Sequence, residues 1–285
     1  MKRIIFIVAA SLMLMSCEDF LDTENLTKKN TSNFPETVED ARQMLSGIYS
    51  TLNYASENPA GTFFFVSELA SDDRLGGGGE NDRMVQAIDN LMNYQTNMLE
   101  NFWEVRYKGI FRANMAIETL DNCTGYESEA QRNHFKGEAY FLRAMFYYEM
   151  ASLYGQVPLV LSTEAQDLPK AEPEAIYAQI AADLEMAIDL MYDRPYDAVE
   201  DGHATKWAAQ ALMARVFLFY TGFYDSADLP VAGEDGSVSG SITKEQVVGW
   251  LEDCINNSGH KLVEDFRELW VYTNEYTVED YEYTA

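Results

Sequence analysis

The sequence contains few basic residues. Lys and Arg together number 20 against 47 Asp and Glu, so the chain of 285 residues carries a formal charge of −27 at pH 7. A surface this acidic repels phosphate backbones and anionic lipid headgroups, which argues against a nucleic-acid partner. Attachment to a membrane must therefore come from something other than a basic patch.

Cysteine and histidine are also scarce, at three residues each. None lies in a C-x-x-C or H-x-x-x-H arrangement, so there is little material for a zinc or thiol-redox site. The acidic loops offer oxygen ligands for calcium, but no EF-hand spacing is present, and we expect no cofactor. Cys123 and Cys254 have no framework of further cysteines around them, which favours two free thiols over a disulfide.

Motifs of catalysis are missing as well. There is no Gly-x-Ser-x-Gly elbow, and nothing in the sequence marks a pair of carboxylates for glycoside hydrolysis. The four glycines at 76–79 lack the Lys and Ser/Thr of a phosphate-binding loop. We therefore expect no enzyme, and a lipoprotein glycoside hydrolase is the alternative.

An export signal begins the chain. Lys2 and Arg3 precede apolar or small residues at 4–15, a run too short to span a bilayer permanently but typical of a secretory signal. The run ends Leu-Met-Ser before Cys17, which resembles a bacterial lipobox, whose Cys is acylated after the preceding peptide is removed. The alternative is an ordinary signal peptide with an incidental Cys.

The lipobox and the composition after it divide the chain into three predicted parts. Residues 1–16 are the lipoprotein signal peptide, and losing them removes Lys2 and Arg3 but no acid, which takes the charge from −27 to −29. Residues 17–36 are polar and form a flexible, lipid-anchored tether. Residues 37–285 form the folded body, and 47% hydrophobic residues in the chain are enough for a full core.

The body is predicted to be all-α. Apolar residues recur at 3–4 spacing, with N-cap and Pro signals at several starts, over six segments: 37–53, 98–122, 128–154, 173–192, 205–221 and 243–257. The third is apolar almost all round from Tyr140 to Tyr154, so it must be covered on more than one side. The Gly-rich or acidic segments 58–97 and 222–241 are predicted to be non-helical.

An internal sequence repeat indicates a solenoid. Met115-Ala-Ile-Glu recurs as Met186-Ala-Ile-Asp, and the Ala, Arg and Tyr of the helix at 128–154 recur 72 residues later. Two successive helices repeating at nearly one offset favour duplicated helical hairpins, as in tetratricopeptide-like stacks. Chance similarity between two Ala- and aromatic-rich helices is the alternative.

Five ordered motifs resemble the SusD/RagB family of Bacteroidetes outer-membrane lipoproteins. Cys-Glu-Asp-Phe-Leu-Asp follows the lipobox, Trp-x-x-x-Tyr-x-x-Ile-x-x-Ala-Asn lies at 103–114, and Gly-Glu-Ala-Tyr-Phe-Leu-Arg-Ala lies at 137–144. Two further motifs follow in the same order along the chain: Leu-Tyr-Gly-x-Val-Pro-Leu at 153–159 and the Ala-rich stretch at 204–216. The ordered set is much more specific than any member of it.

The resemblance implies both a fold and a role. The fold would be four tetratricopeptide-like hairpins wrapped by an irregular C-terminal region. The role would be a cell-surface, lipid-anchored lid over a SusC-like TonB-dependent transporter, to which it delivers oligosaccharide or, in some members, peptide. Family members are usually much longer than this chain, which is therefore expected to be a fragment or a truncated member. A protein-binding helical adaptor without a small ligand is the alternative function.

Sugars are recognised by an aromatic plane under the C–H face and by planar polar groups that bond adjacent hydroxyls. The polar, Gly-rich loop 71–83 offers such groups, and the corresponding stretch in resembling proteins lies near the ligand. The candidate ligand contacts, including three aromatic platforms, are Asp73, Arg74, Asn81, Arg83, Tyr94, Trp270 and Tyr272. The alternative for the loop is a solvated segment whose charges pair with one another or with water.

Other conspicuous residues are predicted to be structural. Helical positions place four aromatic residues in the core or between hairpins: Trp103, Tyr107, Trp207 and Trp250. Arg143 and Arg215 occupy matching positions in apolar surroundings, and we expect each to pair internally with acids such as Glu138 or Glu149.

Overall fold

A computed structural model describes residues 34–53, 62–71, 73–77, 83–91, 99–199 and 202–265. Its α-helices are α2 (Val38–Tyr49), α4 (Phe63–Leu69), α5 (Arg83–Asp89), α6 (Glu100–Thr119), α7 (Glu129–Tyr154), α8 (Pro173–Leu190), α9 (Lys206–Phe223) and α10 (Lys244–Asn257). Short 3₁₀ turns lie at η2 (Ser50–Asn53), η4 (Leu120–Asn122) and η5 (Tyr196–Ala198). Two strands, β1 (Leu229–Ala232) and β2 (Val238–Ile242), form one hairpin.

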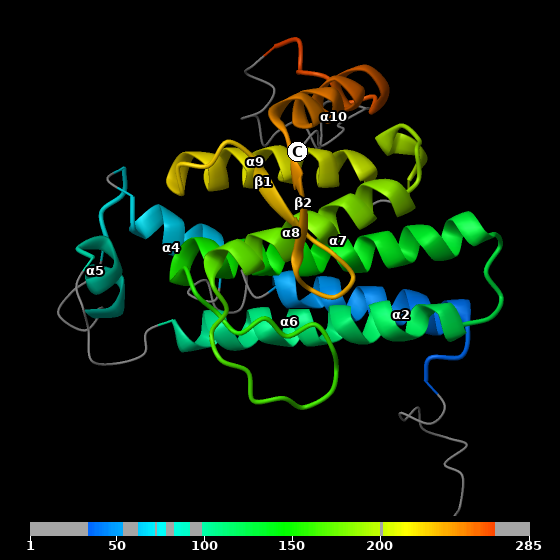
Figure 1. The fold of residues 1–285 in the computed structure, drawn as a ribbon, viewed down its shortest axis with the longest axis horizontal. Helices are drawn as coiled ribbons and strands as arrows, with labels where there is room; N and C mark the ends of the chain where they lie inside the picture. The colour runs from blue at the N-terminus through cyan, green and yellow to red at the C-terminus, as the bar shows by residue number, and fades with distance from the viewer. Residues whose placement is uncertain are drawn as a thin grey trace, which may run out of the picture.

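The long helices stack in layers. Figure 1 shows α2 beside α6 at one side of the stack, then α7, α8, α9 and α10 in succession. Consecutive helices run antiparallel, as helical hairpins do, so the predicted all-α, tetratricopeptide-like solenoid is confirmed. The short helices α4 and α5 lie at one end of the stack, on the left of the view.

Side-chain caps fix the helix starts where the sequence predicts them. Ser128 accepts a hydrogen bond from the Gln131 backbone N–H at the start of α7, and α7 ends at Gly155, whose φ of +69° disfavours other residues. Thr243 and Gln246 form a reciprocal capping box at the start of α10. Caps of this kind satisfy N–H groups that the first helical turn leaves without a partner.

Two segments predicted to be non-helical contain regular structure. The first, 58–97, includes α4 and α5, whose seven residues each are too few for a clear helical period. The second, 222–241, includes the β-hairpin, in which Leu229 pairs with Ile242 and Val231 with Gly240. Leu229 and Ile242 are fully buried, and β1 packs against α8.

The core runs through the stack along α7. This helix packs against both α6 and α8, which confirms that its apolar surface is covered on more than one side. Phe146, Tyr147 and Met150 are fully buried. Gly109 on α6 permits this packing, because a Cβ at that position would lie 2.5 Å from the Phe146 ring.

The four aromatic residues predicted to be structural pack against the body. Trp207 is buried, and its indole N–H donates to the Arg194 carbonyl at 2.7 Å. Trp103, Tyr107 and Trp250 are half-buried against the core, and the Tyr107 hydroxyl donates to the Pro158 carbonyl at 2.7 Å. Their aromatic rings therefore contribute to the packing of the fold.

Both described cysteines carry free thiols, as predicted. Cys123 is buried, which raises the pKa of its thiol, and Cys254 is half-buried on α10. The stack needs no covalent link between these two positions.

Candidate ligand-binding region

The structure describes only part of the predicted ligand-binding set. Asp73 and Arg74 lie in the segment after α4, and Arg83 begins α5, where only its backbone is described. The other predicted contacts lie outside the described residues, as does the lipidation candidate: Asn81, Tyr94, Trp270, Tyr272 and Cys17. Their roles remain predictions.

Helix α4 positions the first two of these residues. Thr62 caps the helix by accepting a hydrogen bond from the Phe65 N–H at 3.2 Å. At the other end, the Ser71 hydroxyl donates to the Glu68 carbonyl at 2.9 Å and accepts from the Asp73 N–H at 3.3 Å. These bonds lie where the chain leaves α4, and Asp73 and Arg74 follow at the surface.

Arg74 forms an ion pair on this surface. Its Nε lies 2.7 Å from Glu68 Oε2, and the two side chains are 59% and 38% exposed. The pairing agrees with the alternative prediction, in which charges of the loop neutralise one another. A guanidinium has five N–H donors in a planar fork, so this contact leaves donors that a ligand hydroxyl can use.

The α4–α5 unit is anchored to the stack by a small apolar cluster. Val66 and Leu69 of α4 and Ile88 of α5 are buried together, with Leu99 and Leu153 packed against them. Gly76 brings the connecting loop against α5, because a Cβ there would lie 2.9 Å from the Val85 carbonyl oxygen. Gly76 therefore has a defined place against α5.

An exposed aromatic ring on α4 was missed by the sequence analysis. Phe64 is 66% exposed, whereas its neighbours Phe63 and Phe65 pack against the two apolar clusters. The signal was present in the sequence, because three consecutive aromatic residues on a helix cannot share one buried face. Phe64 supplies an aromatic plane on the helix that precedes Asp73 and Arg74.

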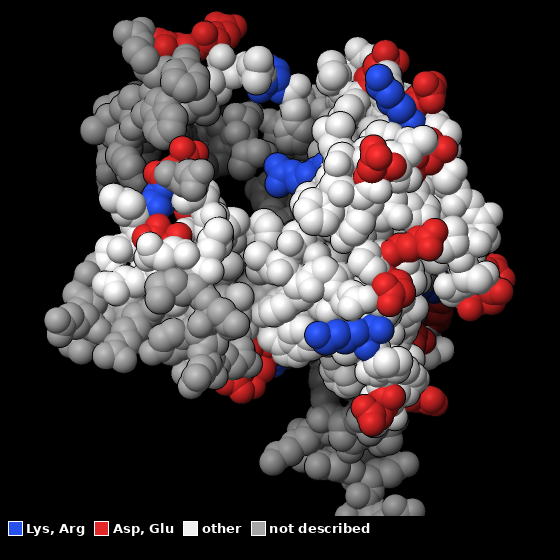
Figure 2. Space-filling view, turned by 60° about the vertical axis from the view of Figure 1, so that its left-hand side comes forward, with Lys and Arg blue, Asp and Glu red and all other residues white. Residues whose placement is uncertain are grey.

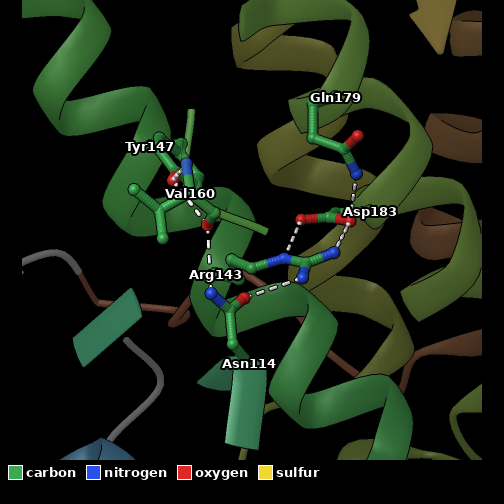
Figure 3. Close-up of polar contacts among 6 residues, drawn as sticks. All are labelled: Asn114, Arg143, Tyr147, Val160, Gln179 and Asp183. Carbon is green, nitrogen blue, oxygen red and sulfur yellow. Dashed lines mark hydrogen bonds and ion pairs between the residues drawn. The ribbon is translucent and has the colours of Figure 1, made fainter. Parts of the chain in front are cut away.

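A buried polar network fixes another loop of the molecule, residues 155–172. In Figure 3, Arg143 of α7 forms a two-pronged pair with Asp183 of α8 and donates to Asn114 of α6 at 2.8 Å. Asn114 donates in turn to the Val160 carbonyl at 3.0 Å, and the Tyr147 hydroxyl donates to the same carbonyl at 2.9 Å. Asn114 and Tyr147 thus hold the loop directly, and the pair of Arg143 with Asp183 fixes Asn114 from behind.

The expected partners of the two arginines were wrong. Arg143 is buried and paired as predicted, but with Asp183 rather than with Glu138 or Glu149. Glu149 pairs with Arg106 instead, and Glu138 accepts from Tyr49 at 2.6 Å. Arg215 is exposed on α9 and does not lie in apolar surroundings, since the helix presents that position to solvent.

The electrostatics of the network favour the charged pair. Burial by itself lowers the pKa of Arg143, but the charge and hydrogen bonds of Asp183 outweigh burial and raise it. Arg143 therefore stays charged and acts as a structural tie rather than a ligand contact.

No metal site is visible in the described part of the chain. Among residues 34–265 outside the gaps, no group of three or more His, Cys, Asp and Glu side chains has the geometry to hold an ion. In the same residues, no helix is both long and apolar enough to cross a membrane.

A family model described as "Starch-binding associating with outer membrane" matches residues 19–218. The chain belongs to the SusD-like family. The resemblance inferred from the ordered motifs is therefore confirmed, and the Trp103, Gly137 and Leu153 motifs all lie inside the matched region.

Curated SusD-like relatives are similar over nearly the whole chain. SusD-like protein P25 of Formosa agariphila is 24% identical, over 98% of this chain and 50% of its own length. SusD-like protein P38 of the same organism is 26% identical, over 90% of this chain and 50% of its length. This SusD-like chain thus spans about half the length of these curated relatives.

Solved structures share the fold. A laminarin-binding SusD-like protein aligns with a TM-score of 0.67 at 25% identity, covering 85% of this chain and 50% of that one. Surface glycan-binding protein A from Bacteroides thetaiotaomicron, solved with laminarihexaose, aligns with a TM-score of 0.66 at 20% identity, covering 84% of this chain and 47% of the other. The fold of these solved structures therefore extends over most of this chain.

Proposed function

We propose that this SusD-like chain binds oligosaccharides at the surface of the outer membrane and passes them on without chemical change. The observation that carries the proposal is the match of residues 19–218 to a starch-binding, outer-membrane-associated family. The similarity to a laminarin-binding SusD-like protein supports a glycan as ligand.

Recognition would combine stacking with paired hydrogen bonds. In the described region, Asp73 and Arg74 offer planar polar groups at the surface, and Phe64 offers an exposed ring on the adjoining helix. The other predicted contacts are part of the same proposal: Arg83 at the start of α5, and Asn81, Tyr94, Trp270 and Tyr272 outside the described residues. Neutral sugars suit this protein, because a charge of −27 disfavours anionic ligands.

Delivery would depend on an anchor and a partner. Acylation of Cys17 would hold the protein to the outer membrane through residues 17–36, since lipid chains supply the attachment that an acidic surface cannot. The partner would be a SusC-like TonB-dependent transporter, over which the protein moves as a hinged lid with ligand held between them.

Affinity electrophoresis tests the binding step. The protein is run through native gels containing laminarin, starch, fructan or no polysaccharide. We expect retarded migration with at least one neutral glycan and no release of reducing sugar. Arg74→Ala should reduce the retardation, whereas Arg132→Ala, which also removes an ion-paired arginine but from a partly exposed position on α7, should not.

The outcomes separate the alternatives. Absence of retardation by every glycan, together with co-purification with a transporter, would replace the proposal with the protein-binding adaptor. Release of sugar would replace it with a hydrolase. Equal retardation of the two arginine variants and the unmodified chain would remove Arg74 from the site.

The anchor is tested separately. Mass spectrometry of the membrane-extracted protein should show an acylated Cys17 at the mature N-terminus, and Cys17→Ser should release the protein from membranes. An unmodified thiol at this position would contradict the lipoprotein assignment without affecting glycan binding.

A further inference from the structure

The C-terminal end of α9 carries a cluster of packed aromatic rings. Phe219 stacks on Phe223 with ring centroids 5.5 Å apart and an angle of 10° between the planes. Tyr177 of α8 also stacks on Phe219, with ring centroids 5.9 Å apart and an angle of 16° between the planes. Tyr224 meets the Phe223 ring edge-on at 4.9 Å. The rings therefore support one another across two helices.

Phe223 is the outermost ring of this cluster. It is 71% exposed, whereas Tyr177 is fully buried and Phe219 is half-buried. The stacked Phe219 and the edge of Tyr224 limit the orientations of the Phe223 side chain, so the exposed ring is held in place rather than free to collapse onto the surface. A large, oriented aromatic surface left open to water costs free energy that burial under a ligand would recover.

Two residues with polar groups follow this ring in the chain. The next residues along the chain are Tyr224 and exposed Asp225, whose φ of +52° marks the turn that ends α9. An aromatic plane followed by a phenol and a carboxylate matches the apolar face and hydroxyl rim of a pyranose ring.

We propose that Phe223 is a second sugar-stacking platform, which takes the C–H face of a neutral hexopyranose unit. The inference rests on the proposed glycan-binding function and extends it to a site on α9 that is separate from the loop after α4. Asp225 accepts hydrogen bonds from sugar hydroxyls in this arrangement, and its negative charge disfavours uronic acids and sulfated sugars.

The two sites lie toward the same end of the helical stack. In Figure 1 the end of α9 and helix α4 are both on the left. Figure 2 turns that side forward and shows carboxylates spread over the face, with fewer basic groups among them. A polysaccharide offers many identical units, so two separate platforms raise the avidity for a long chain more than for a short oligosaccharide.

The test compares two exposed apolar residues of α9. Phe223→Ala removes the ring, and Leu218→Ala removes a side chain that is 70% exposed on the same helix. These positions are five residues apart, which places them on different faces of the helix. Both substitutions are at the surface, and thermal unfolding of each variant checks that the fold is intact.

Calorimetric titration with the neutral polysaccharide that binds the unmodified protein gives the readout. Phe223→Ala is expected to weaken binding about 3- to 10-fold, the range of one stacking contact. Phe223→Trp should restore it, Leu218→Ala should leave it unchanged, and carboxymethylated forms of the same glycan should bind more weakly.

The failures of the two proposals are distinguishable. If the unmodified protein binds glycan and Phe223→Ala binds it equally well, the α9 platform is wrong and the proposed function stands. If Leu218→Ala weakens binding as much as Phe223→Ala does, the effect belongs to a general apolar surface, and the platform is again overturned. If the unmodified protein binds no glycan, both proposals fall.

Discussion

Arg143 and Asp183 form a two-pronged ion pair inside the helical stack. Arg143 Nε donates to Asp183 Oδ2 at 2.7 Å, and Nη2 donates to Oδ1 at 2.6 Å. Both side chains are buried, so the pair joins α7 to α8 where water does not screen it. Gln179 also donates to Asp183 Oδ1 at 2.8 Å, so the Asp183 carboxylate accepts a hydrogen bond from Gln179 as well as two from Arg143.

Removing one partner of this pair should be strongly destabilising. Arg143→Met leaves Asp183 buried without its cation, and we expect the free energy of unfolding to fall by about 3–5 kcal/mol. Denaturant unfolding measures the loss. The double variant Arg143→Met/Asp183→Leu should lose less than the two single variants together, because neither charge is then left alone.

A partly exposed ion pair provides the control. Arg132 lies 3.1 Å from Glu129, with side chains 36% and 77% exposed, and Arg132→Ala should change the free energy of unfolding by less than about 1 kcal/mol. Equal losses at Arg143 and Arg132 would contradict the role assigned to the buried pair.

The Tyr49 hydroxyl links α2, α7 and the segment before α9. It donates to Glu138 Oε2 at 2.6 Å and accepts from the Ala204 N–H at 2.7 Å. Burial, then the nearby Glu138 charge, raises its pKa, so the hydroxyl keeps its proton as the donor. Tyr49→Phe should lower the free energy of unfolding by about 1–3 kcal/mol, because the buried Glu138 carboxylate and the Ala204 N–H each lose a partner.

Tyr192→Phe is the matched control for this prediction. The ring of Tyr192 stacks on His134 with centroids 4.1 Å apart, and the substitution keeps that ring while removing a hydroxyl from a half-buried position. A loss at Tyr192 as large as at Tyr49 would show that the hydroxyl bridge is not the cause.

Two helical glycines should respond to alanine in opposite directions. Gly109→Ala places a methyl group 2.5 Å from the Phe146 ring, and we expect a loss of about 1–3 kcal/mol in the free energy of unfolding. Gly249→Ala on α10 meets nothing within 4 Å and should gain about 0.5–1 kcal/mol, since alanine favours the helix. Thermal unfolding distinguishes the two signs, and stabilisation by Gly109→Ala would contradict the packing described.

The contact between α9 and α10 should depend on pH. Hydrogen bonds from Gln210, then Asn257, lower the pKa of Asp253 below its usual 3.8. A carboxylate with a lowered pKa stabilises the folded protein above pH 3.8 and loses that contribution as the pH falls toward its folded value. Asp253→Asn should therefore be less stable than the unmodified chain at pH 6, by about 1 kcal/mol, with the difference shrinking at pH 3.

A difference in stability that stays constant from pH 6 to pH 3 would show that the charge of Asp253 does not contribute. Urea unfolding of both proteins across that range measures it.

The fold was largely predictable from the sequence because its determinants are local. The 3–4 spacing of apolar residues, the Ser128 cap and the stop at Gly155 define α7 without knowledge of its neighbours. The β-hairpin was missed although Asp235 and Gly236 form its turn, with Gly236 at φ +77°. Its strands are short, β1 contains Pro230, and β2 contains Ser and Gly, so they lack the alternating pattern of a buried strand.

The pairing of buried charges was not predictable. Asp183 lies 40 residues after Arg143, and which of the many acids it meets depends on how α7 and α8 pack. The exposure of Phe223 likewise depends on the packing of Tyr177 and Phe219 beneath it. Sequence spacing shows which residues share a helix face, but not which faces meet across helices.

The central claim is that this SusD-like chain binds neutral oligosaccharide and leaves it intact. Calorimetric titration of residues 17–285 with a size series of neutral oligosaccharides, followed by analysis of the recovered sugar, tests it most directly. The account predicts saturable heat with at least one series, affinity that rises with chain length, and sugar recovered unchanged. No binding to any glycan, or shortened products, would contradict it.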